Sequence, residues 1–417
     1  MASDNRWGAL RHRDFRLLLA GRLTSQLGNS VSVVALAFAV LDTLGSPSAL
    51  GLVLAAEGVS LAVCLLIGGV VADRFPRRTV MISADVVRFA SQGVLAALLI
   101  WGHVHLWHFL VLQVVSGAAS AVFIPAVGAV QPEVVPKEDL QGANALRGLV
   151  IAIAGIVGPS AGGLLLIVLR PGHALALDSL SFLLSALWVS RIKAGDTAGS
   201  RGGSVLASLA EGWGEFRSRR WLWTVTAQSA VVRMMGLAPV MVLGPTLYHD
   251  GGGAKSWGMV LSGLGLGAFV GGVVSSRLKV RRPLLVAVAG TFTFVPMIWL
   301  LAADAPAVAI ALAGVLVGVE QSLYWTYWQT TLHRHVPSEV LSRVSSFDWL
   351  GAYAFEPIGY ALAGPVAAVA GVTPTLVAAG SVVAVGTTAV LLVPEVRNLE
   401  LDDDSDGTPA RTTGVTG

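Results

Sequence analysis

The chain of 417 residues is 54% hydrophobic and only 13% charged, with a mean hydropathy of +0.72, so it has too little polar surface to cover a soluble globule. Its net charge of +3 and pI near 9.2 do not indicate nucleic acid as a partner, because the basic residues form short clusters between apolar stretches. The lipid bilayer is the expected surrounding of this protein.

Apolar stretches long enough to cross a bilayer follow one another along the whole chain. Taking about 20 apolar residues as one crossing, we predict an all-α membrane protein with twelve transmembrane helices in two six-helix bundles. The predicted spans lie near residues 15–41, 48–72, 79–101, 107–130, 141–169, 173–191, 221–247, 256–276, 283–302, 306–331, 340–369 and 373–393. The first, fifth and eleventh are long and carry polar residues, so tilts or breaks are expected there.

Prolines inside spans predict local irregularity. Pro159, Pro296 and Pro357 each lie within a predicted span. A proline removes one helical hydrogen bond and favours a kink. Helices five, nine and eleven are therefore expected to bend.

Two repeated motifs indicate that the chain is a duplicated six-helix unit. The turn after span two, at 69–78, reads GVVADRFPRR, and the turn after span eight, at 272–282, repeats its glycine and its arginines as GVVSSRLKVRR. The segments VPKEDL at 135–140 and VPSEVL at 336–341 recur at nearly the same offset. Two repeats at a common distance predict an N-terminal bundle at 1–192 and a C-terminal bundle at 221–394.

The distribution of basic residues predicts the orientation. Most Lys and Arg residues outside the spans fall on the side of both termini, against only Arg170 and Lys255 on the other side. The positive-inside rule then places both termini in the cytoplasm of a multi-pass plasma membrane protein. No cleavable signal peptide precedes the first span, which is expected to remain as a mature helix.

Two polar segments lie outside the bundles. Residues 193–220 are expected to form a cytoplasmic linker, Gly/Ser-rich at first and then amphipathic over 205–216, where the apolar residues recur at helical spacing. Residues 395–417, rich in Asp, are expected to be a disordered cytoplasmic tail.

The first basic turn resembles a known family signature. Gly69, Asp73, Arg74, Arg77 and Arg78 are similar to the turn between helices two and three of the major facilitator superfamily, Gly-x-x-x-Asp-Arg-x-Gly-Arg-Arg. A proline replaces the second glycine, as in the exporter branch that includes enterobactin and macrolide efflux carriers. The resemblance covers almost the whole chain and implies a monomeric carrier that works by alternating access.

Span five carries a second resemblance. Gly158, Pro159, Gly162 and Gly163 are similar to the family's antiporter motif, Gly-x-x-x-Gly-Pro-x-x-Gly-Gly, which implies export of a small organic compound, such as a drug, a siderophore or an amphipathic metabolite, in exchange for protons. A purely packing role for these residues is the alternative. At the level of function, the alternatives are an uptake symporter of the same fold and a non-transporting membrane scaffold or receptor.

The acidic residue of the first turn is a candidate for gating. Asp73 would be held by arginines and by the positive N-terminal end of helix eleven, where Pro337 and Ser338 indicate a helix start. Release of this contact would open the inner gate. The alternative is that the turn only anchors the positive side of the membrane.

Charged residues deep in spans are costly, and each is therefore a functional candidate. A carboxyl that alternates between dry and wet surroundings can take up and release a proton, and Glu57 and Glu356 are the first candidates for this role. Asp85 and Arg88 are also candidates, but they are three residues apart on one helix, so a static ion pair is equally compatible with the sequence.

A substrate cavity is predicted from polar and aromatic residues at mid-membrane depth. An aromatic wall with a few amides suits a partly apolar organic molecule. The predicted lining residues are Gln26, Asn29, Gln113, Arg233, Glu320, Tyr324 and Trp325. For the aromatic residues, an interfacial belt is the alternative.

Neither a cofactor nor an enzymatic activity is expected. His103, His105 and His108 share one external turn, but no Cys, Asp or Glu lies nearby to complete a metal site. The chain also lacks a phosphate-binding Gly-x-x-x-x-Gly-Lys-Ser/Thr loop and a His-Glu-x-x-His motif. The expected ligands are therefore the transported compound and protons.

Overall fold

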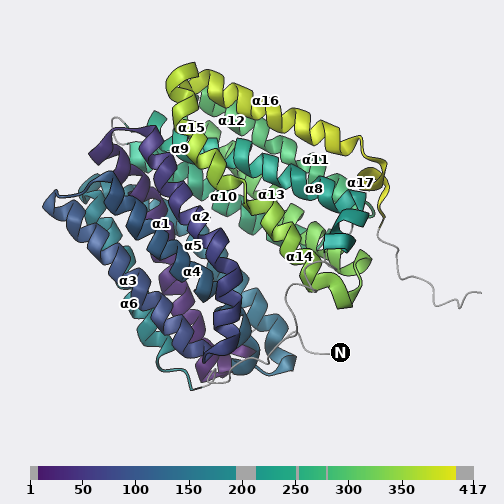
Figure 1. Ribbon diagram of the computed structural model, residues 1–417, viewed down its shortest axis with the longest axis horizontal. Coiled ribbons are helices and arrows are strands. Elements are labelled where there is room, and N and C mark those ends of the chain that lie inside the picture. The colour runs from purple at the N-terminus through teal and green to yellow at the C-terminus, as the bar shows by residue number, and fades with distance from the viewer. Residues whose placement is uncertain (1–7, 194–212, 250–252, 279, 401–417) are drawn as a thin grey trace, which may run out of the picture.

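The computed structural model describes residues 8–193, 213–249, 253–278 and 280–400, and the regular structure in these ranges is helical (Figure 1). The first half forms one bundle with short 3-10 turns at Gly8–Arg11 and Lys137–Asp139. Its long helices are α1 (Arg13–Leu44), α2 (Pro47–Arg74), α3 (Arg77–Trp101), α4 (Leu106–Val134), α5 (Leu140–Val168) and α6 (Pro171–Val189).

The second half forms a bundle of shorter pieces, because several of its spans are interrupted. Its helices are α8 (Arg220–Val231), η3 (Val232–Leu237), α9 (Ala238–Leu247), α10 (Gly253–Ser275), α11 (Pro283–Gly290), η4 (Thr291–Thr293), α12 (Phe294–Ala302), α13 (Ala307–His335), α14 (Ser338–Tyr353), α15 (Glu356–Ala370), α16 (Val372–Leu391) and α17 (Pro394–Asn398).

The predicted spans are matched by these helices. Eleven helical stretches of the described chain are long and apolar enough to cross a membrane. The remaining predicted span, 340–369, is covered by α14 and α15, which are 16 and 15 residues long. The expected break in this span is confirmed, since α14 ends at Tyr353 and Pro357, four residues later, cannot donate to the Tyr353 carbonyl.

Three interruptions in the second half each precede a proline. A π-helical turn, η3, lies between α8 and α9 ahead of Pro239; a 3-10 turn, η4, lies between α11 and α12 ahead of Pro296; and Ala354 and Phe355 separate α14 from α15. In contrast, α5 continues through Pro159 without a break. The irregular backbone is therefore concentrated in the C-terminal bundle.

The two bundles have separate cores and one shared contact region. In the first bundle, Phe109 and Phe123 belong to two different buried clusters. A third cluster joins the bundles, because Val34 and Phe38 of α1 pack with buried residues of the second half, including Trp257 of α10. Apolar packing thus helps to hold the two bundles together.

Glycines allow the bundles to approach backbone to backbone. A Cβ atom at Gly51 of α2 would lie 2.1 Å from the carbonyl oxygen of Tyr360, and one at Gly265 of α10 would lie 2.1 Å from that of Gly155. Such distances leave no space for a side chain. The pairs α2 with α15 and α5 with α10, visible side by side in Figure 1, form the interface.

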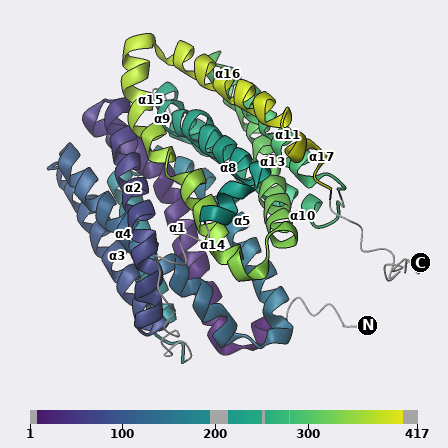
Figure 2. The same cartoon turned by 45° about the vertical axis from the view of Figure 1, so that its right-hand side comes forward.

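The interface is closed at one end. Gly364 of α15 lies against Ser48 at the start of α2, and His249 after α9 hydrogen-bonds Asp42 of α1 over 2.9 Å. We call this the closed end. Away from it α14 packs on α8 of its own bundle, and the bundles diverge towards the end with the basic turns at 74–78 and 277–282, which we call the basic end (Figure 2).

The predicted linker falls largely outside the described residues. Of the span 193–220, the described part includes a helical turn at 213–218. Within it, Phe216 is buried and its ring lies 6.2 Å from that of Phe347 on α14. The end of the linker is therefore attached to the half of span eleven that diverges from the first bundle.

The first residues of the expected disordered tail, 395–417, are ordered in the described chain. The short helix α17 occupies its start, and Val396 is fully buried in a cluster with Leu284 and Leu222. Arg282 also pairs with Glu400 over 2.8 Å. Apolar burial orders these residues although the adjacent sequence is acidic, and residues 401–417 lie outside the described chain.

The contact between α5 and α10 can be tested by cross-linking. The hydroxyl oxygens of Ser160 and Ser262 lie 2.7 Å apart across the bundle interface. In a Cys64→Ser background, which removes the native cysteine, we expect Ser160→Cys with Ser262→Cys to form a disulfide on mild oxidation, detected by altered gel mobility. The two single-cysteine variants serve as controls, and failure of the pair to cross-link would contradict the packing described.

Candidate functional site

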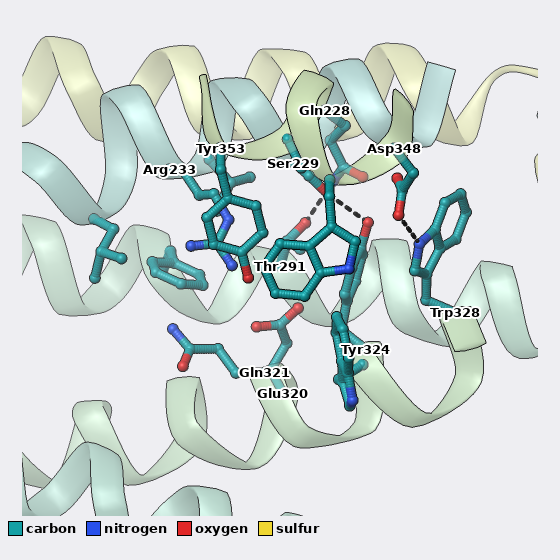
Figure 3. Close-up of a pocket in the computed structure, with 16 residues that line it drawn as sticks. Gln228, Ser229, Arg233, Thr291, Glu320, Gln321, Tyr324, Trp328, Asp348 and Tyr353 are labelled. Carbon is teal, nitrogen blue, oxygen red and sulfur yellow. Dashed lines mark hydrogen bonds between the residues drawn. The ribbon is translucent and has the colours of Figure 1, made fainter. Parts of the chain in front are cut away.

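A cavity of about 300 Å³ lies within the C-terminal bundle (Figure 3). It is partly open, and residues from α8, η3, the α11 to α12 segment, α13 and α14 form its wall. The lining residues are Gln228, Ser229, Val232, Arg233, Leu237, Thr291, Phe294, Glu320, Gln321, Tyr324, Trp325, Trp328, Asp348, Trp349, Ala352 and Tyr353.

Aromatic rings form much of this wall. Trp349 and Tyr353 are one helical turn apart on α14 and stack with ring centroids 4.6 Å apart. Trp325 of α13 meets Trp349 edge to face at 5.7 Å, and Tyr324 stacks on Trp328 at 6.4 Å. The wall thus offers flat apolar faces to a ligand.

Polar groups around the cavity are joined by hydrogen bonds. The amide of Gln228 donates to the hydroxyls of Thr291 at 2.8 Å and Thr387 at 3.2 Å. Asp348 accepts from the Thr226 hydroxyl at 2.7 Å and from the Trp328 indole N–H at 2.8 Å. These contacts fix the positions of the residues that line the cavity.

An ion pair connects two of the helix interruptions. Arg233, in the π-helical turn η3, donates to Glu356, the first residue of α15, over 3.1 Å. The hydroxyl of Tyr360 donates to the other carboxylate oxygen at 2.8 Å, and the Arg233 guanidinium lies 3.6 Å from the ring centre of Tyr353. The pair therefore joins the cavity wall to the hinge between α14 and α15.

Glu356 also adjoins the interface between the bundles. The next residue, Pro357, is the close neighbour of Gly58 on α2, where an added Cβ would lie 3.1 Å from its ring. Glu356 thus lies between Arg233, which lines the cavity, and the contact of Pro357 with Gly58 across the bundle interface.

Glu57 belongs to a separate polar network in the N-terminal bundle. Its carboxylate accepts a hydrogen bond from Gln113 at 3.2 Å, and Gln113 in turn accepts one from Gln92 at 2.9 Å. Gln113 is only 1% exposed and is not a lining residue of the 300 Å³ cavity. Glu57 is half-buried, and the network joins α2, α4 and α3 of the first bundle.

Asp85 and Arg88 form the intrahelical pair that their spacing allows. Their charged groups are 3.8 Å apart, and both residues are buried. The Arg88 guanidinium lies 3.7 Å from the ring centre of Phe182, and buried Asp178 adds a further negative charge to its surroundings. Because the two residues contact each other inside the bundle, the static ion pair exists, and their role in proton coupling stays a prediction.

The arginines of the basic turn attach it to neighbouring helix ends. Arg77 donates to the Ala129 carbonyl at 3.1 Å and pairs with Glu133 of α4, while Arg78 bonds the carbonyls at the end of α6. Arg74 is exposed. The side chains at positions 69 and 73 lie outside the described part of the structure, so the gating roles of Gly69 and Asp73 remain predictions.

The glycines of α5 face two different partners. Gly158 lies against Ser30 and Gly162 against Val31, both on α1. Gly163 lies against the Ala254 carbonyl of α10, and the Pro159 carbonyl lies against Gly258 of the same helix. The motif therefore lets α5 pack closely within its bundle and across the interface at once.

The predicted cavity residues separate into two groups. Arg233, Glu320, Tyr324 and Trp325 line the cavity together, whereas Gln26 and Asn29 are half-buried on α1 and are not among its lining residues. Sequence reasoning missed Ser229, Thr291, Trp349 and Tyr353 as lining residues. The spacing of Trp349 and Tyr353, four residues apart in a broken span, is a signal that could have indicated them.

Comparison with known proteins identifies the fold. Residues 18–353 match the model of the Major Facilitator Superfamily. The chain is 28% identical to the multidrug efflux pump Tap of Mycolicibacterium fortuitum over 403 residues, which is 92% of this chain and 97% of that protein. It is 24% identical over 239 residues to macrolide efflux protein A of Streptococcus pyogenes, covering 57% and 59% of the two chains.

A solved structure has the same architecture. The nucleoside transporter NupG superposes with a TM-score of 0.70 over 91% of this chain and 98% of that chain, at 12% sequence identity. At this identity the likeness extends to the fold alone.

The Arg233 and Glu356 pair should stabilise the protein measurably. Replacing one partner leaves the other charge partly buried without its counter-ion, so Arg233→Gln is expected to lower the free energy of unfolding in mixed micelles by about 1–3 kcal/mol. The double variant Arg233→Gln with Glu356→Gln should lose less than the sum of the single variants. Strict additivity in this cycle would show that the two side chains do not interact.

Proposed function

The chain belongs to the Major Facilitator Superfamily, and we propose that it exports a small, partly apolar organic compound from the cell in exchange for protons. It is a multi-pass membrane transporter with the fold of that family. The direction of transport, the proton coupling and the cytoplasmic position of the basic end belong to the proposal.

Export is supported by the relatives and by the helix-five motif. Two relatives are named efflux proteins, one for multiple drugs and one for macrolides. Gly158, Pro159, Gly162 and Gly163, which resemble the antiporter motif, lie where α5 touches α1 and α10. A helix that contacts both bundles is well placed to couple their relative movement to binding.

The orientation follows from the charges of the basic end. Arginines at 74–78 and 277–282 gather at this end, and the positive-inside rule places it at the cytoplasm. The structure, closed near Asp42 and His249, then corresponds to a state open to the cytoplasm. Asp73 would hold the start of α14 against the basic turn in the opposite state, when the inner end closes.

The observation that carries the proton coupling is the position of Glu356. This carboxylate bonds Arg233 and Tyr360 at the hinge between α14 and α15, and its neighbour Pro357 contacts the first bundle. A proton on Glu356 would cancel its charge and weaken the pair with Arg233, which is strong only between ionised groups in a poorly hydrated site. Arrival of a proton would thus loosen α15, which carries the contact with the first bundle, from η3.

Glu57 offers a second position for the coupled proton. It lies in the N-terminal bundle with Gln113, near the buried Asp85 and Arg88 pair. Protonation there would change the charge balance around Arg88 rather than the hinge. Variants of the two acids should therefore differ, because only Glu356 lies at the break between α14 and α15.

Transport into everted bacterial membrane vesicles tests the proposal. With erythromycin and ethidium as probes, we expect accumulation inside vesicles that are acidic inside, abolished by a protonophore. Glu356→Gln should reduce gradient-driven accumulation at least about tenfold while keeping exchange of unlabelled for labelled probe, because it removes the proton site and not the cavity. Glu138→Gln, an exposed carboxyl on the N-terminal bundle, is the matched control.

Other outcomes would replace the proposal. Accumulation driven only by a gradient that is acidic outside the vesicles would indicate an uptake symporter, and probe binding without movement would indicate a receptor. If Glu356→Gln keeps full gradient-driven accumulation, another acid carries the coupled proton. Glu57→Gln is the next variant to test.

A further inference from the structure

We propose that the cavity of the C-terminal bundle is a binding site for organic cations, in which Glu320 pairs with the positive charge and the aromatic wall holds the apolar body. This inference rests on the proposed function, because it assumes that the transported compound binds in this cavity. Beyond that function, it states that the compound is a cation and that Glu320 selects it.

Glu320 is a buried carboxyl group without a hydrogen-bond or ion-pair partner at contact distance within the described residues, and Arg233 is the cation that acts on it electrostatically. Its side chain is 5% exposed, and in this part of the chain no ion pair or hydrogen bond reaches its carboxylate. In Figure 3 it rises from α13 beside Gln321 and points into the cavity towards Tyr353. A buried charge without a counter-ion in contact is costly, so the site is completed by a proton or by a cationic ligand.

The backbone around Glu320 makes room for this side chain. A Cβ atom at Gly290, the last residue of α11, would lie 2.8 Å from the Cγ atom of Glu320. The 3-10 turn η4 follows directly and brings Thr291 into the cavity wall. The absence of a side chain at Gly290, next to a helix interruption, therefore makes the space that the Glu320 side chain occupies.

The charges that line the cavity favour a cation. Its charged lining residues are Arg233, Glu320 and Asp348. The arginine is already paired with Glu356 at 3.1 Å, and Asp348 accepts two hydrogen bonds from neutral donors. Arg233 thus faces both Glu356 and Glu320, and the two lining acids outnumber it, so an anionic ligand would face net repulsion in the cavity.

The aromatic wall supplies a second form of cation recognition. Trp325, Trp349 and Tyr353 form a continuous series of ring contacts beside the cavity. The last ring already holds a cation, because the guanidinium of Arg233 lies 3.6 Å from its centre. Aromatic faces next to a carboxylate are suited to a desolvated ammonium or phosphonium group.

Equilibrium binding of two ions of equal shape and opposite charge tests the inference. We expect the full chain in lipid nanodiscs to bind tetraphenylphosphonium, measured by equilibrium dialysis against empty nanodiscs, and to bind tetraphenylborate at least about tenfold more weakly. Glu320→Gln should raise the dissociation constant for the phosphonium at least about tenfold, whereas Glu320→Asp, which keeps the charge, should retain most of the affinity. Glu138→Gln should bind as the parent does.

Two results would overturn the proposed cation site. Equal affinity for the two ions, or unchanged phosphonium binding in a Glu320→Gln protein, would overturn the cation site. Because binding is measured without a gradient, it is separate from the transport assay. Phosphonium binding through Glu320 in a protein that shows no proton-driven accumulation would support the cation site and reject the proposed coupling.

Discussion

The cost of placing a charge inside a membrane protein is the constraint on which this structure depends. Each buried charge needs an opposite charge, hydrogen-bond donors or a hydrated space. In the N-terminal bundle, Arg88 and Asp85 meet this need by contacting each other. In the C-terminal bundle, Arg233 is paired with Glu356, and Glu320 instead faces a cavity. Both bundles thus contain an internal charge pair, but only the described part of the C-terminal bundle also places a charged residue without such a pair at the wall of the 300 Å³ cavity.

Backbone continuity shows the same division. The helices of the first bundle run unbroken, even through Pro159 in α5, whereas three spans of the second bundle are interrupted ahead of a proline. Irregular backbone in a membrane protein requires a protein-lined or hydrated environment to satisfy its polar groups. Arg233 and Thr291 lie in two of these interruptions and both line the cavity. The breaks therefore position the side chains of the site, and the ion pair at Glu356 connects them to the contact between the bundles.

The fold is largely predictable from the sequence because apolar length and basic turns are local signals. These signals predict the number of helices and the break near Pro357. The residues around Arg77 indicate the family. The lining of the cavity depends instead on which helix faces meet in space, which a single sequence does not specify. Gln113 has the right depth but contacts Gln92 and Glu57 inside its own bundle, whereas Tyr353, the last residue of α14 before the break, lines the cavity.

In the proposed mechanism, access alternates between the closed end and the basic end as the two bundles move relative to each other. Distances between spin labels at both ends, measured by double electron–electron resonance in a Cys64→Ser background, test it most directly. One pair, Thr43→Cys with Thr246→Cys, reports on the closed end, and another, Lys137→Cys with His333→Cys, on the basic end. When the transported compound binds, alternating access predicts a longer first distance and a shorter second one. Two distances that stay fixed, or that change in the same direction, would contradict it.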